Sequence, residues 1–288
     1  MDKGLFYILC GFSFALGACI ASFLNVVIWR VPRGESIVSP PSHCPKCNAA
    51  IKWYQNIPIL AWLALRGKCA NCKAPISPRY ILIELLGGVL FLAAFWKVAP
   101  HLVQDGPCHW SIPTALLIDL YVSWIWIALM IVGSMIDFDH KLLPDFVTVG
   151  GMVLGVGSSV LSSFVFPHPS SLIPHPFVSL LGLAFGFGLL WLIRFFGSKA
   201  FKREAMGLGD VFLMGAVGAL FGPVAVLVTL ILSSVFGSIV GVSMIALSKT
   251  KFGKFVEIPY GPYICLGCLA WMFYGPELVN GYLALMRP

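Results

Sequence analysis

The chain has 288 residues, of which 59% are hydrophobic and 11% are charged, and its formal net charge is +7. With a mean hydropathy of +0.91, this composition excludes an ordinary soluble globular domain and predicts a chain whose main solvent is the lipid bilayer. The positive charge needs no nucleic acid to explain it, because the cytoplasmic loops of membrane proteins are rich in Lys and Arg and face anionic headgroups. We therefore expect membrane lipids, and no nucleic acid, among the partners.

Eight apolar stretches predict an all-α polytopic membrane protein with about eight transmembrane helices. They are Gly4–Trp29, Ile81–Val98, Ser111–Ile136, Phe146–Phe166, Pro176–Phe196, Val211–Phe221, Val224–Leu247 and Pro262–Leu285. Most have about 20 residues, which is enough to cross the hydrocarbon core. The sixth stretch is short and ends at a Gly-Pro break, and we expect the first to be retained because no small-residue cleavage pattern follows it.

The basic residues predict which side of the membrane each loop faces. They gather in the segments 30–80, 137–145, 194–204 and 248–257, whereas the segments 101–110 and 167–175 contain no Lys or Arg. Because short basic loops stay in the cytoplasm, the pattern predicts cytoplasmic basic segments and both termini outside. It also predicts three parts: a first transmembrane helix (1–29), a cytoplasmic loop (30–80) and a transmembrane catalytic core of about seven helices (81–288).

The cytoplasmic loop contains two Cys-x-x-Cys pairs, Cys44 with Cys47 and Cys69 with Cys72. Two such turns complete the tetrahedral set of four thiolates that zinc prefers. The alternative is a pair of disulfides, but these are rare in the reducing cytoplasm. We therefore expect a structural zinc ion, since four protein ligands leave no open position for catalysis.

The remaining cysteines are expected to be small apolar residues of the helices. They are Cys10, Cys19, Cys108, Cys265 and Cys268. A second metal site at the last two, which lie on one helix face, is disfavoured because no other ligands flank them.

Two carboxylates at the edge of the predicted membrane core are the candidate catalytic residues. Asp137 ends the third span, and Asp210 follows glycines at the start of the sixth, both on the predicted cytoplasmic side. Ionisable groups at membrane depth are costly and are functional candidates by default. Two adjacent carboxylates that share one proton can activate water and protonate a scissile amide, which is aspartic peptidase chemistry.

The other acidic and histidine residues near the spans have simpler explanations. Asp139 would point away from Asp137 on a helix, His140 is expected to be solvated, and Asp145 is expected to be the N-cap of the fourth span. Glu84 is expected to pair with Arg79 or Lys73, and Asp119 to have a structural or substrate-positioning role. Asp210 could itself be only a helix N-cap, because Gly-x-Gly-Asp alone is a weak signal.

Several separate motifs together resemble the type IV prepilin leader peptidases, a family of bifunctional enzymes. The motifs are Ala21–Val27, the two cysteine pairs, Asn56-Ile57-Pro58, Arg79-Tyr80 leading to Glu84, Ile136-Asp137 through Leu143-Pro144-Asp145, Gly207-Leu208-Gly209-Asp210 and Ile258–Tyr263. The resemblance implies that Asp137 and Asp210 form the catalytic pair. It also implies a multi-pass protein of the bacterial inner membrane, with its active site facing the cytoplasm.

By the same resemblance, the substrates are type IV prepilins or the pseudopilins of type II secretion. The enzyme would remove a short leader after a glycine and then methylate the new N-terminal amine with S-adenosylmethionine. The residues themselves show no nucleotide-binding glycine motif. The methyl-donor ligands therefore stay unassigned, and the cytoplasmic loop is the expected location.

Two other functions are compatible with some of these features. A transporter or metal-handling channel would use the aspartates as ion relays, but it would distribute acids through the membrane depth. Another Gly-x-Gly-Asp intramembrane protease would cleave within helices, but it would not require the cysteine pairs. A prepilin leader peptidase accounts for both the aspartate pair and the two cysteine pairs.

Overall fold

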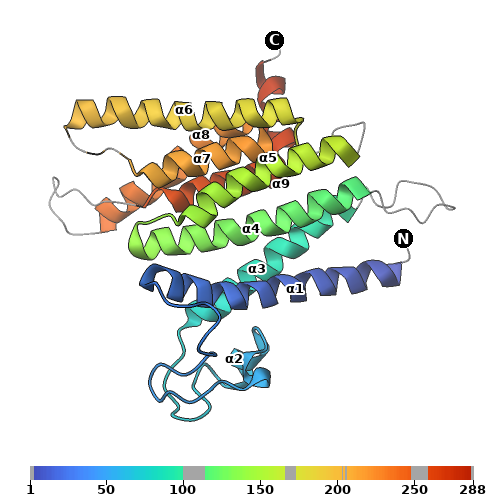
Figure 1. The fold of residues 1–288 in the computed structure, drawn as a ribbon, viewed down its shortest axis with the longest axis vertical. Coiled ribbons are helices and arrows are strands. Elements are labelled where there is room, and N and C mark those ends of the chain that lie inside the picture. Colours follow the sequence, from blue (N-terminus) through green and yellow to red (C-terminus); the bar gives the residue numbers. More distant parts are fainter. Residues whose placement is uncertain are drawn as a thin grey trace. The chain divides into compact units, whose positions relative to one another are not determined.

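The computed structural model describes residues 3–99, 114–165, 173–202, 204, 206–247 and 259–286, which are mostly helical (Figure 1). The helices are α1 (Lys3–Arg30), α2 (Leu60–Ala64), α3 (Pro78–Val98), α4 (Thr114–His140), α5 (Asp145–Val165), α6 (Pro176–Phe201), α7 (Leu208–Phe221), α8 (Pro223–Leu247) and α9 (Gly261–Met286). Two short 3-10 helices, η1 (Val31–Arg33) and η2 (Trp53–Asn56), lie between α1 and α3. The described residues contain no β-strand, so the predicted all-α fold is confirmed.

Each of the eight predicted apolar stretches corresponds to one helix. Six helices, α1, α3, α4, α5, α6 and α8, are long and apolar enough to cross a membrane. Helix α7 has only 14 residues, and α9 departs from helical geometry at Tyr274, two residues before Pro276. The segments 101–110 and 248–257, most of 167–175, Cys108 and Ile258 lie outside the described residues. Eight spans, the predicted sidedness and the predicted domain boundaries therefore stay predictions.

The chain divides into two compact units, which we describe separately. The first contains Met1–Pro113 and Ser123–Val132, and the second contains Thr114–Val122 and Gly133–Pro288. In the first unit, α1 packs against α3. A Cβ atom added to Gly17 of α1 would lie 2.5 Å from the carbonyl oxygen of Gly87 in α3. Close backbone approach over small residues is a typical packing mode of membrane helices.

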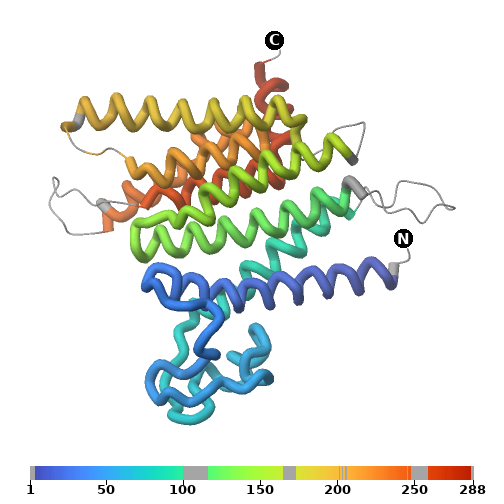
Figure 2. The backbone as a smooth tube through the Cα atoms, in the orientation of Figure 1, coloured from blue at the N-terminus to red at the C-terminus, as the bar shows by residue number. Residues whose placement is uncertain are grey.

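Between α1 and α3, the chain of the first unit forms a compact irregular segment instead of a single long loop (Figure 2). It contains η1, η2 and α2 and both cysteine pairs. The N-terminus of α3 is fixed by Ser77, whose side chain accepts the backbone N–H of Arg79. The segment is thus held at both ends by helices long enough to span a bilayer.

Helix α7 is the internal helix of the second unit. It is packed against α5, α6, α8 and α9, and Asp210, Val211 and all residues from Leu213 to Leu220 are buried. At about 1.5 Å per residue, its length is about 21 Å, shorter than the roughly 30 Å hydrocarbon core. Helix α7 is therefore enclosed by protein from Leu213 to Leu220, and its first turn carries Asp210.

We predict that the packing of α6 on α7 tolerates no side chain at Gly182. A Cβ atom there would overlap the carbonyl oxygen of Gly218 in α7, whereas a Cβ atom at Gly188 of the same helix meets nothing within 4 Å. Overpacking costs typically 1–3 kcal/mol and more when the backbone must move. Gly182→Val should therefore lower the thermal unfolding midpoint in detergent by several degrees. Gly188→Val, the matched control, should not, and equal midpoints for the two variants would contradict this packing.

Candidate functional site

Asp137 lies in the last turn of α4, which continues to His140. Its side chain is buried, at 6% exposure. The backbone N–H of Gly261, the first residue of α9, donates a hydrogen bond of 3.0 Å to its Oδ2 atom. Asp139, two positions later, is exposed, which confirms that only one of the two faces the protein interior.

Asp210 lies in the first turn of α7 and is also buried, at 8% exposure. The N-cap is Gly207, whose backbone is extended (φ −65°, ψ 148°) and which has no side chain to cap the helix. A Cβ atom on Gly207 would lie 3.5 Å from Oδ2 of Asp210. Asp210 is thus the third residue of the helix, turned back toward the cap residue, and the alternative that it is itself the N-cap is wrong.

The second unit brings the two carboxylates into one buried region. Gly261, which donates to Asp137, and Gly209, which precedes Asp210, both approach the side chain of Leu143. The end of α4, the start of α7 and the start of α9 therefore converge. Each of the three helices contributes a group to the region.

Leu143, in the connection between α4 and α5, packs against the backbone beside both carboxylates. A Cβ atom on Gly209, which precedes Asp210, would lie 2.8 Å from Cβ of Leu143. A Cβ atom on Gly261, which donates to Asp137, would lie 3.4 Å from Cδ1 of the same side chain. Leu143 therefore separates two backbone segments: the one that carries Asp210 and the one that donates a hydrogen bond to Asp137.

The start of α9 is held in place by α8. The hydroxyl of Tyr260 lies 2.7 Å from Oγ of Ser233 and 3.3 Å from Oγ of Ser234. The next residue, Gly261, approaches Asp137 so closely that an added Cβ atom would lie 2.6 Å from Oδ2. Only glycine fits there without a shift of the carboxylate, and the Tyr260 contacts hold the preceding residue against α8.

This arrangement can perform acid–base chemistry without a metal. Two buried carboxylates that repel one another resist simultaneous ionisation, so that one proton is retained between them. The ionised member can activate a water molecule, and the protonated member can donate to a leaving group. The hydrogen bond from Gly261 orients one of the two carboxylates for this work.

The other residues singled out in the sequence lie elsewhere. His140 is exposed, as expected. Asp145 is the first residue of α5, one position inside the helix, because the backbone N–H groups of Val147 and Thr148 donate to the carbonyl of Pro144. Its predicted N-cap position is therefore wrong by one residue. Asp119 is a buried residue of α4.

Glu84 has a role that sequence reasoning missed. Its Oε2 atom accepts the backbone N–H of Ile59 at 2.7 Å, whereas an ion pair with Arg79 or Lys73 was expected. Ile59 has φ 63° and ψ −54°, and the N–H of Leu60 donates to the carbonyl of Pro58, which is a strained γ-turn. Glu84 of α3 thus stabilises a turn between the two cysteine pairs.

Three residues that complete the aspartate region were present in the sequence motifs but received no role there, and a fourth, Ser233 of α8, belonged to no motif. The three are Leu143, Tyr260 and Gly261. A Gly-Pro dipeptide in front of an apolar run is a recognisable helix start, but no pattern indicates that its N–H points at a carboxylate more than a hundred positions away. That information lies in the packing of α8 against α9.

The four cysteines of the predicted zinc loop form one cluster in the first unit. Their sulfur atoms all lie within 4.8 Å of one another, with 3.9 Å between Cys44 and Cys72 and 4.0 Å between Cys47 and Cys69. Zinc–sulfur bonds of about 2.3 Å in a tetrahedron place sulfurs roughly 3.8 Å apart. The cluster therefore has the size that a zinc ion requires.

The two cysteine pairs have the same local geometry. Cys44 donates its N–H to the carbonyl of Ala49, and Cys69 donates to Ala74. The residue after each second cysteine, Asn48 or Lys73, has a positive φ, 55° and 59° respectively. Each pair is thus a tight turn that presents two sulfur atoms on one side, as the spacing predicts.

The thiols are poised to bind a cation. The backbone N–H groups of Lys46, Ala49 and Cys72 lower the pKa of Cys44, Cys47 and Cys69 respectively. The backbone N–H of Ala74 acts in the same direction on Cys72, but burial and the three neighbouring thiols raise its pKa to about 11. Four thiolates at this distance repel one another, and a divalent cation is the group that balances them.

Comparison with known proteins places this architecture in a family. Residues 15–98 match the family model described as the bacterial peptidase A24 N-terminal domain, and residues 124–242 match that of the type IV leader peptidase family. A prepilin leader peptidase/N-methyltransferase from Stutzerimonas stutzeri is 32% identical over 98% of this chain and 96% of its own length. The chain belongs to the type IV leader peptidase family.

Further family members cover the chain to different extents. The prepilin leader peptidase/N-methyltransferase of Pseudomonas aeruginosa is 31% identical over 97% of this chain and 94% of its own length. That of Myxococcus xanthus is 40% identical over 81% of this chain, which spans only 62% of the relative's length. No solved structure matches the chain. The N-terminal family segment contains the cysteine cluster, and the leader peptidase segment contains Asp137 and Asp210.

We predict that the purified protein retains about one zinc ion per chain. Cys44→Ser should lose most of the metal, because a serine hydroxyl is a much weaker ligand than a thiolate. Elemental analysis by mass spectrometry measures the zinc content directly. Cys10→Ser, in α1 and outside the cluster, is the matched control. Zinc content equal in the two variants would exclude the cluster as the metal site.

Proposed function

We propose that this protein is a membrane aspartic endopeptidase that removes the leader peptides of type IV prepilins or pseudopilins, with Asp137 and Asp210 as its catalytic pair. One observation carries the proposal: two buried carboxylates from α4 and α7 lie beside backbone segments that pack against the same side chain, Leu143, within a single compact unit. The family and the printed names of its relatives supply the substrate class.

The two aspartates receive different roles in this mechanism. Asp137 acts as the base, because the hydrogen bond from the N–H of Gly261 stabilises its ionised form. Asp210 holds the proton and donates it to the leaving amine nitrogen. Water activated by Asp137 attacks the scissile carbonyl, and the tetrahedral intermediate collapses as the proton of Asp210 passes to the amine.

The active site is assigned to the cytoplasmic face of the bacterial inner membrane, with eight helices crossing or entering the bilayer. The segment between α1 and α3 supports this orientation, because it carries basic residues throughout and positive loops stay in the cytoplasm. The cysteine cluster would then lie in a reducing compartment, where thiolates are available to bind zinc.

A second activity, methylation of the new N-terminus, is proposed from the names of the relatives, which are leader peptidases and N-methyltransferases. S-adenosylmethionine, when bound, supplies an electrophilic methyl group to the amine, which releases a proton and leaves S-adenosylhomocysteine. The zinc-organised segment of the first unit is assigned to this activity.

The alternative functions account for fewer of the observations. A transporter would need ionisable groups along a path through the membrane, whereas Asp137 and Asp210 lie at one helix end and one helix start that meet at one place. A different intramembrane protease would leave the cysteine cluster without a purpose.

We predict that Asp137→Asn and Asp210→Asn each reduce the rate of leader cleavage by at least about 100-fold, because each removes an acid–base group. The measurement is cleavage of a purified prepilin in detergent or liposomes, followed by gel electrophoresis. Asp139→Asn is the matched control, since this residue is exposed and only two positions from Asp137. If either Asp137→Asn or Asp210→Asn cleaved prepilin at the wild-type rate, the substituted residue would not be catalytic.

We also predict that Gly261→Ala lowers kcat for cleavage by about tenfold or more. The added methyl group would displace the Asp137 carboxylate, because it would lie 2.6 Å from Oδ2, and misplacing a catalytic group costs rate even when the protein folds. Gly281→Ala, in the same helix with nothing within 4 Å, should be neutral. An unchanged kcat for Gly261→Ala would show that the Gly261 hydrogen bond does not orient the base.

A further inference from the structure

The segment between α1 and α3 exposes large apolar side chains, although it lies outside the apolar stretches of the sequence. Trp53 of η2 is 81% exposed and Leu60 of α2 is 64% exposed. The two short helices pack against one another, and five exposed side chains of this stretch form what we call the apolar patch: Trp53, Tyr54, Ile57, Leu60 and Leu63. Exposed apolar clusters of this kind mark an interaction surface.

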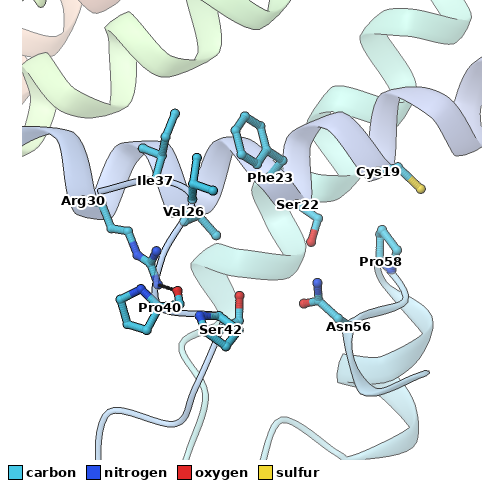
Figure 3. A pocket seen from close by; sticks show the side chains of 12 residues that line it. Cys19, Ser22, Phe23, Val26, Arg30, Ile37, Pro40, Ser42, Asn56 and Pro58 are labelled. Carbon is cyan, nitrogen blue, oxygen red and sulfur yellow. Dashed lines mark hydrogen bonds between the residues drawn. The ribbon is translucent and has the colours of Figure 1, made fainter. Parts of the chain in front are cut away.

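The apolar patch lies alongside α1 and not beyond its end. Figure 3 shows Asn56 and Pro58, which belong to the same stretch as the patch, opposite Ser22 and Cys19 of α1, and all four residues line one cavity. Ser22 is eight residues before Arg30, the last residue of α1, which is roughly 12 Å along the helix axis. The stretch is therefore level with the body of the helix.

Helix α3 gives a similar depth by a separate contact. Glu84, which is buried, accepts the backbone N–H of Ile59 at 2.7 Å, in the middle of the patch stretch. Glu84 is six residues after Pro78, the first residue of α3, or about 9 Å along the axis. Both helices are long and apolar enough to cross a bilayer, whose headgroup region is roughly 5–8 Å thick on each side. The patch therefore lies at the depth of the headgroups or of the outer hydrocarbon.

A loop that precedes the cysteines is fastened to the same part of α1. The terminal nitrogens of Arg30 donate to the carbonyls of Ser36 and Pro40, each at 2.8 Å. Between these two attachment points, the apolar side chain of Val38 is exposed. The loop thus adds an uncovered apolar group at the end of the same helix.

The charge of the segment fits an anionic surface. Residues 31–77 contain six Lys or Arg residues and one acidic residue, which gives a formal net charge of +5. Lys52 lies 5.9 Å from the ring centroid of Tyr54, and Arg33 lies 3.7 Å from that of Trp29. Aromatic rings beside bases are typical of the headgroup region. The six bases are all exposed: Arg33, Lys46, Lys52, Arg66, Lys68 and Lys73.

We propose that the apolar patch is a membrane anchor, which inserts into the headgroup region of an anionic phospholipid leaflet while the neighbouring bases bind lipid phosphates. Spanning helices tether both ends of the segment, so that the patch meets lipid before it meets a soluble partner. Insertion holds the segment against the bilayer and fixes the depth of the cysteine cluster, which the same segment carries. The proposal is independent of both proposed enzymatic activities.

The test uses the purified full chain with the substitution Trp53→benzoylphenylalanine, a photoreactive residue, in liposomes of phosphatidylglycerol and phosphatidylcholine. After irradiation, intact-mass spectrometry measures which molecule has become attached. We expect phospholipid adducts, at a yield several-fold higher than for His43→benzoylphenylalanine. His43 is the matched control, because it is an exposed residue of the same segment outside the patch. Leu181, exposed on the spanning helix α6, gives the reference yield for a lipid-facing side chain.

The contribution of charge is measured in the same chain. Lys52→Glu should lower the lipid-adduct yield at position 53 by about twofold or more, because it replaces attraction to anionic headgroups by repulsion. Lys199→Glu makes the same change at an exposed position of α6 in the second unit, and it should leave the yield unchanged. Thermal unfolding midpoints verify that each variant folds.

Three results would overturn the proposal. They are equal lipid-adduct yields at positions 53 and 43, equal effects of Lys52→Glu and Lys199→Glu, and adducts with a second copy, or with another protein when native membrane vesicles are irradiated, in place of lipid. Both leaflets of the liposomes have the same composition, so the result does not depend on the assigned sidedness. Prepilin cleavage is not measured, so failure here leaves the peptidase proposal untouched.

Discussion

Burying two carboxyl groups close to one another is the constraint that organises the second unit. A buried carboxylate is costly unless it is hydrogen-bonded or protonated, and a pair is costlier still. The structure meets this cost with a backbone donor from Gly261 for Asp137 and a position near the helix N-cap for Asp210. Because the donors are backbone N–H groups, their positions depend on where α7 and α9 begin. Both helices begin at or next to glycines, which allow the backbone to approach neighbouring groups closely.

Helix packing and chemistry are therefore connected in this unit. Gly209 and Gly261 both lie against Leu143, and the Tyr260 hydroxyl contacts serines of α8. None of these residues carries charge, yet each determines where a carboxylate lies. The small residues of the site act as spacers, which is why the Gly-x-Gly-Asp pattern is more informative with its packing partners than alone.

Much of this arrangement was accessible from the sequence because it depends on composition and short spacing. The eight apolar stretches predicted eight helices, and the two Cys-x-x-Cys pairs predicted the cluster, since both are local patterns. The helical period also separated Asp137 from Asp139. The contacts of Glu84 with Ile59 and of Gly261 with Asp137 were not accessible, because they join distant segments through backbone N–H groups that every residue possesses. A side-chain pattern cannot indicate which backbone group will be used.

Helix α7 has a consequence for how the protein responds to its lipid environment. Membranes differ in hydrophobic thickness, and helices exposed to lipid respond by tilting. Helix α7 is enclosed by four other helices and is fastened to α6 by glycine contacts that leave no room to slide. The depth of Asp210 in the membrane is thus set by protein packing. A thicker or thinner bilayer should change the tilt of the surrounding helices before it changes the depth of this carboxyl group.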